Sequence, residues 1–224
     1  MPIKVLIFDL DDTLYPEKEF VMSGFKADSE FLKKTQGLEI FEKLAKRFNS
    51  GERGDLFTHV LAEHIPEVRE SYVKELVKVY RSHQPSIKPF PEVRRVLANL
   101  KGQYRLGLIS DGHLSVQKNK LASLNLSEFF ELIIFTDLWG YSFWKPHPRS
   151  FREAISFFRV DPSEAVYIGD NPLKDFIGAR QVGLSTLRIR RKGTFHHDLK
   201  RLDEEEADAE YESLNDLLDY VKTA

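Results

Sequence analysis

The chain has 224 residues, which is enough for one large domain or for a core domain with a smaller insert. Its net charge of −2 gives no electrostatic reason to expect nucleic acid or an anionic membrane as a partner. Cysteine is absent, which excludes disulfide bonds, thiolate catalysis and zinc–thiolate sites. No apolar run approaches the ~20 residues of a membrane span, and no signal segment opens the chain, so we expect a cytoplasmic protein.

A short apolar segment opens the chain and ends in three carboxylates. Residues Ile3 to Phe8 are nearly all apolar and often β-branched, which predicts a buried strand of a parallel sheet. Asp9 and Asp11 follow two positions apart, so their side chains share one side if strand geometry persists. Two such carboxylates repel unless a cation or a proton lies between them. Because ligands bind at the carboxyl ends of strands in open α/β sheets, these residues predict a metal-assisted site.

Residues 16–84 are predicted to be helical. Apolar positions recur at helical spacing over residues 20–32, 38–48 and 68–80, and a polar loop at 49–54 separates two of these stripes. Such stripes are typical of helices that pack against one another. We therefore expect a helical insert between the first strand and the rest of the chain.

Helices and short apolar strands alternate after the prolines at 85, 89 and 91. Strands are predicted at 105–110, 132–135, 165–168 and 185–189, and helices at 91–100, 113–124, 148–158, 173–182 and 212–221. This alternation predicts an α/β fold with a Rossmann-like, doubly wound parallel sheet. Residues 203–210 are mostly acidic, and we expect them to be solvated.

Three further polar motifs lie where strands of this sheet should end. Ser110-Asp111-Gly112 follows one strand, Lys145-Pro146 precedes a helix, and Gly169 to Asp175 leads from a strand into a helix. Each has an ordinary explanation by itself, as a turn, a solvated charge or a helix cap. Together with the first motif, their order and their placement at predicted strand ends indicate a single site.

This ordered set of motifs resembles the haloacid dehalogenase superfamily, in the branch whose helical cap lies between the first and second motifs. The resemblance covers Ile3 to about Arg190. It implies a catalytic core at 1–14 and 88–224 and a helical cap at 15–87. It also implies a Mg²⁺-dependent phosphatase that acts through an aspartyl-phosphate.

The resemblance implies the following roles for the carboxylates. Asp9 is the nucleophile and a magnesium ligand, and Asp170 is the second carboxylate ligand. Asp11 is the general acid and base, and its backbone carbonyl contacts the metal. Asp175 holds metal-bound water.

The resemblance also implies a phosphate-binding set. Ser110, with the backbone near Asp111 and Gly112, binds phosphate oxygens, and Lys145 supplies positive charge. Thr13 belongs to the same set and is expected to hydrogen-bond near the general acid. One departure concerns Asp111, because this branch of the family commonly has Asn there.

Several alternatives stay open. A phosphomutase or a 2-haloacid dehalogenase uses the same fold, and a non-catalytic binding protein is a third possibility. The substrate is expected to be a small phosphorylated metabolite, such as a sugar phosphate, a nucleoside monophosphate or an acylneuraminate phosphate.

We expect the protein to be a monomer or a homodimer. Basic residues of the insert, such as Arg47 and Arg53, can meet anionic groups of a substrate, and the aromatic segment Trp139 to Trp144 is expected to be ordinary loop packing.

Overall fold

The structure is a computed structural model that describes residues 2–65, 67–200, 202 and 205–223. It divides into two compact units, one formed by Met1–Glu17 and Ile87–Ala224 and the other by Lys18–Ser86. We call the first the core unit and the second the helical unit. The helical unit falls inside the segment 15–87 that the sequence marks as an insert.

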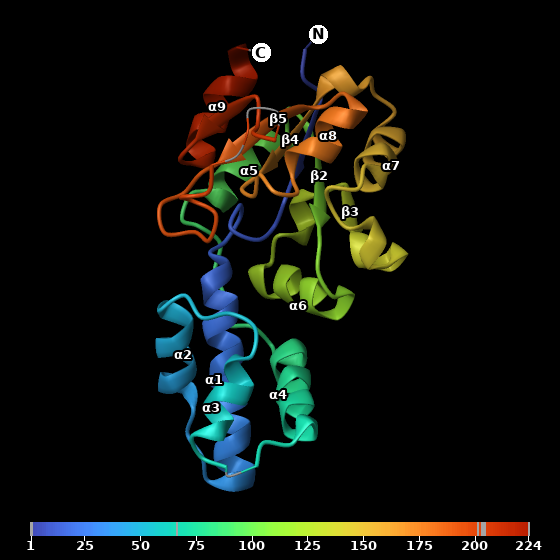
Figure 1. The fold of residues 1–224 in the computed structure, drawn as a ribbon. Helices are drawn as coiled ribbons and strands as arrows, with labels where there is room; N and C mark the ends of the chain where they lie inside the picture. Colours follow the sequence, from blue (N-terminus) through green and yellow to red (C-terminus); the bar gives the residue numbers. More distant parts are fainter. Residues whose placement is uncertain (1, 66, 201, 203–204, 224) are drawn as a thin grey trace. The chain divides into compact units, whose positions relative to one another are not determined.

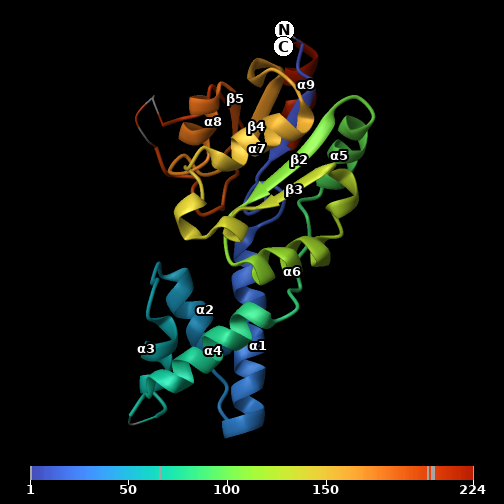
Figure 2. The same ribbon diagram turned by 90° about the vertical axis from the view of Figure 1, so that its right-hand side faces the viewer.

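The core unit is built on a parallel sheet, as predicted (Figures 1 and 2). Its strands in the described residues are β1 (Val5–Phe8), β2 (Arg105–Ser110), β3 (Leu132–Phe135), β4 (Ala165–Gly169), β5 (Ser185–Ile189) and β6 (Ala209–Tyr211). Their order is β3-β2-β1-β4-β5-β6, and every neighbouring pair is parallel. The strand order therefore reverses between β1 and β4, which makes that point a crevice for ligands.

Strand β6 differs from the expectation of a solvated acidic segment. Residues Ala209–Tyr211 pair with β5, whereas 203 and 204 lie outside the described residues. The nearby acidic side chains meet arginines of β5: Glu206 lies 2.9 Å from Arg188, and Glu210 lies 3.2 Å from Arg190. These ion pairs accompany a strand that was not predicted, whereas the Glu210 side chain stays 45% exposed and is solvated as expected.

Helices cover both faces of the sheet. The α-helices of the core unit are α5 (Val93–Lys101), α6 (Leu114–Leu124), α7 (Arg149–Phe158), α8 (Phe176–Val182) and α9 (Leu214–Thr223). The short 3₁₀ turns are η1 (Ser127–Phe129), η2 (Thr136–Trp139), η3 (Tyr141–Phe143) and η4 (Pro162–Glu164). Helix α5 packs against α9 on one face, and α7 packs against α8 on the other (Figures 1 and 2).

The main hydrophobic core lies between the sheet and helices α7 and α8. Val5 and Ile7 point into it from β1, because alternate residues of a strand share a face. The ring of Phe158 packs closely on β2, where a Cβ on Gly107 would lie 3.1 Å from it. This dense packing fixes the backbone at the strand ends that carry the polar motifs.

The helical unit consists of α1 (Glu17–Gln36, which begins in the core unit), α2 (Phe41–Asn49), α3 (Leu56–Ala62) and α4 (Glu70–Ser82). Aromatic rings fill its interior: the Phe25 ring lies 5.8 Å from Phe48 and 6.1 Å from Tyr80. In the described part of the chain, no helix combines the length and apolar content that a membrane crossing requires.

Candidate active site

Strands β1 and β4 are neighbours, and the residue after each is an aspartate. Asp9 follows β1 directly, and Asp170 follows β4. Asp175 lies one turn further on, just before α8. The three carboxylates therefore meet at the edge where the strand order reverses, as the motifs predicted.

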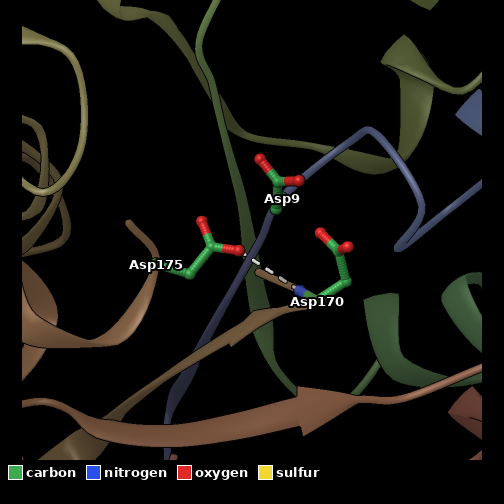
Figure 3. Close-up of side chains that lie close together, drawn as sticks. All are labelled: Asp9, Asp170 and Asp175. Carbon is green, nitrogen blue, oxygen red and sulfur yellow. Dashed lines mark hydrogen bonds between the residues drawn. The ribbon is translucent and has the colours of Figure 1, made fainter. Parts of the chain in front are cut away.

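The three aspartates form a buried cluster (Figure 3). One carboxylate oxygen from each lies within 4.8 Å of the others, and the exposed fractions of the residues are 2%, 4% and 0% for Asp9, Asp170 and Asp175. Within the described residues, Oδ2 of Asp9 and Oδ2 of Asp170 are buried and accept no hydrogen bond. Buried carboxylate oxygens without a donor are costly, and a hard divalent cation fits such a donor set.

Electrostatics confirm the crowding of negative charge. Burial raises the pKa of Asp9 to about 7, although Lys145 opposes the shift. Burial, together with the charges of Asp175 and Asp9, raises the pKa of Asp170 well above its usual range. Burial alone would raise the pKa of Asp175, but Lys145 and Lys174 outweigh burial and lower it. A bound cation would relieve the remaining repulsion.

Lys145 is buried beside the cluster and joins two of its members. Its Nζ lies 2.5 Å from Oδ1 of Asp9 and 2.7 Å from Oδ1 of Asp175. It also donates to the Tyr167 hydroxyl at 2.8 Å, and that hydroxyl donates to Asp175 at 3.2 Å. Lys145 thus meets Asp9 as predicted.

Two glycines explain why the local sequence permits this arrangement. Oδ2 of Asp175 accepts from the backbone amides of Asp170 and Asn171, at 3.2 and 2.9 Å, which folds the carboxylate back over the end of β4. A Cβ on Gly169 would lie only 2.5 Å from that oxygen. A Cβ on Gly178 in α8 would lie 2.2 Å from the Pro146 carbonyl, so this glycine lets α8 approach the segment that carries Lys145.

Asp11 is held by a separate set of polar groups. Its Oδ1 lies 2.7 Å from Nζ of Lys120 and accepts a hydrogen bond from the Tyr15 hydroxyl, and its Oδ2 lies 3.3 Å from Nε2 of Gln117. Burial would raise the pKa of Asp11, but the Lys120 ammonium and the hydrogen bonds outweigh it and lower the pKa. The carboxylate of Asp11 is therefore ionised in this arrangement.

The expectation for Thr13 needs correction. Its hydroxyl is buried and makes no hydrogen bond within the described residues, so it does not support Asp11. Tyr15, Gln117 and Lys120 orient that side chain instead. The Ser110 hydroxyl is also buried and donates to Oε1 of Gln117 at 3.2 Å, which links the predicted phosphate-binding motif to the Asp11 group.

Asp111 is accommodated by hydrogen bonds at the position where the related branch commonly has Asn. Its Oδ1 accepts from the Thr136 hydroxyl at 2.6 Å and from the backbone amide of Lys145 at 3.2 Å. Its Oδ2 lies 3.7 Å from Nζ of Lys174. The extra carboxylate therefore ties the Lys145 segment to the end of β2. Gly112 follows it and lines the cavity described below.

Sequence reasoning missed Gln117, Lys120, Tyr15 and Tyr167. A signal existed for the first two, because they lie three apart on a helix that starts directly after the Ser110 motif and so share the face toward the site. In a single sequence, nothing distinguishes Tyr15 and Tyr167 from ordinary residues of the apolar core.

A cavity of about 600 Å³ opens beside these groups, wholly within the core unit. Asp11, Lys145 and Lys174 line it, and so do Tyr141 and Trp144. The expectation that the aromatic segment is ordinary loop packing is therefore wrong for Tyr141, which is 78% exposed. Trp144 is half-buried and packs against the rings of His113 and Tyr141, as that expectation holds.

Comparison with known proteins identifies the family. A model of haloacid dehalogenase-like hydrolases matches residues 6–189. The chain belongs to the haloacid dehalogenase-like hydrolase family. The predicted family is thus confirmed, and with it the α/β fold and the prediction of an enzyme.

Several curated relatives of this haloacid dehalogenase-like hydrolase are phosphatases. A glyceraldehyde 3-phosphate phosphatase from Methanopyrus kandleri is 29% identical, over 98% of this chain and 97% of the relative. One from Pyrococcus abyssi is 32% identical, over 83% and 80%. The pyrophosphatase PpaX of Bacillus thuringiensis is 26% identical, over 84% of each chain.

Solved structures share the fold over nearly the whole chain. The HAD-hydrolase YfnB from Bacillus subtilis, bound to magnesium, has a TM-score of 0.70 at 19% identity and 99% coverage of both chains. A 2-haloacid dehalogenase from Pseudomonas syringae has a TM-score of 0.68 at 24% identity, again with 99% coverage of both. The fold alone therefore accommodates more than one reaction.

Proposed function

We propose that this chain is a Mg²⁺-dependent phosphatase that hydrolyses a small phosphorylated metabolite through an aspartyl-phosphate on Asp9. The observation that carries the proposal is the buried cluster of Asp9, Asp170 and Asp175, with two carboxylate oxygens that lack a donor, beside Lys145. The names of the phosphatase relatives support the same class of reaction.

Asp9 and Asp170 would hold the cation directly, together with the backbone carbonyl of Asp11. Asp175 would hold water that is bound to the cation. Their hard oxygen donors suit Mg²⁺. When bound, the cation neutralises charge on the phosphate dianion and on the nucleophile. Lys145 contributes further positive charge from the chain itself.

In the first half-reaction, a carboxylate oxygen of Asp9 attacks phosphorus while the bond from phosphorus to the ester oxygen breaks. The backbone amides of Asp111 and Gly112 donate to phosphate oxygens, and the Ser110 hydroxyl does so once it gives up its bond to Oε1 of Gln117. Asp11 gives a proton to the leaving oxygen, which departs as an alcohol.

In the second half-reaction, water attacks the phosphorus of the aspartyl-phosphate and Asp11 takes its proton. Inorganic phosphate leaves and the carboxylate of Asp9 is restored. The contact with Lys120 favours the ionised form of Asp11, which is the form that this step needs. For the first step, Asp11 must carry a proton, so we propose that its contact with Lys120 loosens when the substrate binds.

We also propose that the helical unit is the cap of this enzyme and that it gates access to the site. The unit is inserted in the chain between β1 and α5. The segments near Tyr15-Pro16 and Pro85–Pro89 are the proposed hinges.

The test is phosphate release from sugar phosphates and nucleoside monophosphates, with Mg²⁺ and after removal of metal with EDTA. We expect activity only with Mg²⁺, and none for Asp9→Asn, which is isosteric and lacks the nucleophile. With p-nitrophenyl phosphate, whose leaving group needs little help from an acid, an acid-quenched Asp11→Asn variant should carry one added phosphate by mass, because loss of the base slows the second half-reaction by ~10² to 10⁴.

Product analysis and one further substrate separate the alternatives. A phosphomutase would regenerate a sugar phosphate rather than free phosphate. A dehalogenase would release halide when a 2-haloacid is added in place of the phosphate ester. Full phosphate release by metal-free protein would contradict the Mg²⁺ requirement.

A further inference from the structure

The segment between β3 and α7 places aromatic rings at the mouth of the site. Tyr141 begins the turn η3 and is 78% exposed, although a side chain of this size gains stability from burial. Trp144 follows η3 and comes directly before Lys145. Both aromatic residues line the cavity that also contains Asp11 and Lys145.

The Trp144 ring is fixed relative to the catalytic groups. Its Nε1 donates to Oδ1 of Asp137 at 3.3 Å, and Oδ2 of Asp137 accepts from the backbone amide of Leu114, the first residue of α6. The Tyr141 ring lies 4.9 Å from the Trp144 ring, at an interplanar angle of 58°. The pair is thus attached both to the helix that orients Asp11 and to the segment that carries Lys145.

The other groups that line the cavity are charged or polar. Among the lysines, Lys145 is bonded to Asp9 and Asp175, and Lys174 lies 3.7 Å from Asp111. Three neutral polar side chains also belong to the lining: Gln117, Ser142 and Asn171. Beside the two rings the cavity therefore offers hydrogen-bonding groups, which suit a leaving group that has both an apolar ring face and hydroxyl groups.

We infer that Tyr141 and Trp144 form the surface on which the substrate's leaving group packs, and that the enzyme prefers phosphate monoesters of ring-bearing alcohols. Sugars and nucleosides meet this description. Short acyclic esters would leave the rings uncovered. The inference rests on the proposed phosphatase function and narrows its substrate class.

The test compares kcat/KM, with Mg²⁺, for two groups of substrates. Uridine 5′-monophosphate and glucose 6-phosphate carry rings, whereas glycerol 3-phosphate and phosphoglycolate do not. We expect the wild type to prefer the ring-bearing esters. Tyr141→Ala should lower their kcat/KM roughly tenfold and change glycerol 3-phosphate less than twofold, because one stacked ring is lost.

Two further variants make the comparison specific. Tyr141→Phe keeps the ring and should retain the preference. Phe143→Ala removes a ring of the same turn that packs on His147 and Arg149 instead of lining the cavity, so the preference should be unchanged. The exposure of Tyr141 means that its truncation removes little buried surface, and an unchanged thermal midpoint would show that the variant is folded.

The outcomes separate the two proposals. Hydrolysis of no phosphate ester by folded wild type would overturn the phosphatase function itself. Hydrolysis with a preference for acyclic esters, or equal losses on both groups in Tyr141→Ala, would overturn the aromatic surface and leave the phosphatase function standing.

Discussion

At the residue scale, Lys120 is the one charged group among the three side chains described above that hold Asp11, the proposed acid–base residue. Its side chain is 3% exposed and its ammonium lies 2.7 Å from Asp11, so the pair is shielded from water and its geometry is well defined. A charge-assisted bond of this kind both attracts and orients its partner. We therefore regard Lys120 as a positioning residue for Asp11.

Replacement of this ammonium should slow turnover without removing any group that touches the phosphate. We expect Lys120→Met to lower kcat by ~10- to 100-fold, because small displacements of a catalytic group are costly. Lys118→Met is the matched control on the same helix, since Lys118 is exposed, and it should stay within twofold. Steady-state phosphate release would measure both, and equal kcat values in the two variants would contradict the positioning role.

At the scale of secondary structure elements, the turn that follows β4 requires a glycine at the last position of the strand. Asp175 can fold back over Gly169 only because no Cβ is present there. We expect Gly169→Ala to displace Asp175, to lower the thermal midpoint by several degrees and to reduce kcat more than 100-fold. Gly102→Ala is the control, because its Cβ would meet nothing within 4 Å. Equal thermal midpoints and equal kcat values in the two alanine variants would show that the close approach of Asp175 to Gly169 is not required.

Helix α1 carries a buried acid that belongs to no catalytic group. Asp28 is fully buried in the helical unit, and burial raises its pKa from the ordinary 3.8 to about 8. Between those pH values the folded chain keeps a proton that the unfolded chain releases. The contribution of Asp28 to the free energy of unfolding is therefore greatest below pH 4 and is lost as the pH rises toward 8.

Asp28→Asn should abolish this fall in stability with rising pH. In urea unfolding, we expect the variant to gain about 3 kcal/mol relative to wild type as the pH rises from 5 to 7.5, since the wild type loses ~1.4 kcal/mol per pH unit over most of this interval. Asp55→Asn, at an exposed position of the same unit, should show no such trend. A pH-independent difference between Asp28→Asn and wild type would show that Asp28 does not titrate in this way.

The elements also show how far a single sequence can be interpreted. The strands at 105–110, 132–135 and 185–189 were predicted with their observed bounds, because short apolar runs between turn residues leave little choice. Helix α8 was predicted from Leu173 but begins at Phe176, since Asn171 to Asp175 form a hydrogen-bonded turn instead. Strand β6 was missed because its stability comes from pairing with β5 and from arginines distant in sequence.

The candidate site was predictable where its chemistry follows from motif order. The four motifs named Asp9, Asp170, Asp175 and Lys145, and the structure brings these side chains together. The group around Asp11 was not predictable to the same degree. Its partners come from a helix whose orientation depends on tertiary packing, and a buried lysine cannot be told from a solvated one by type alone.

At the scale of the whole molecule, two arginines of the helical unit have partners within that unit. Arg47 lies 2.9 Å from Glu52 and 2.7 Å from Glu63, and the Arg53 guanidinium lies 3.9 Å from the centre of the Phe48 ring. These contacts weaken the expectation that either arginine meets an anionic substrate group.

The bonds that Lys145 makes to Asp9 and Asp175 have a consequence for how the proposed metal would be acquired. The charge that compensates these two carboxylates is covalently part of the chain, so assembly of the site does not depend on a dissociable ion. Folding and metal loading are then separate events, unlike in small zinc domains that unfold on chelation. We expect EDTA to abolish activity while the far-UV circular dichroism stays unchanged, and Mg²⁺ to restore activity within the mixing time. Slow recovery that required refolding would show that the two events are coupled.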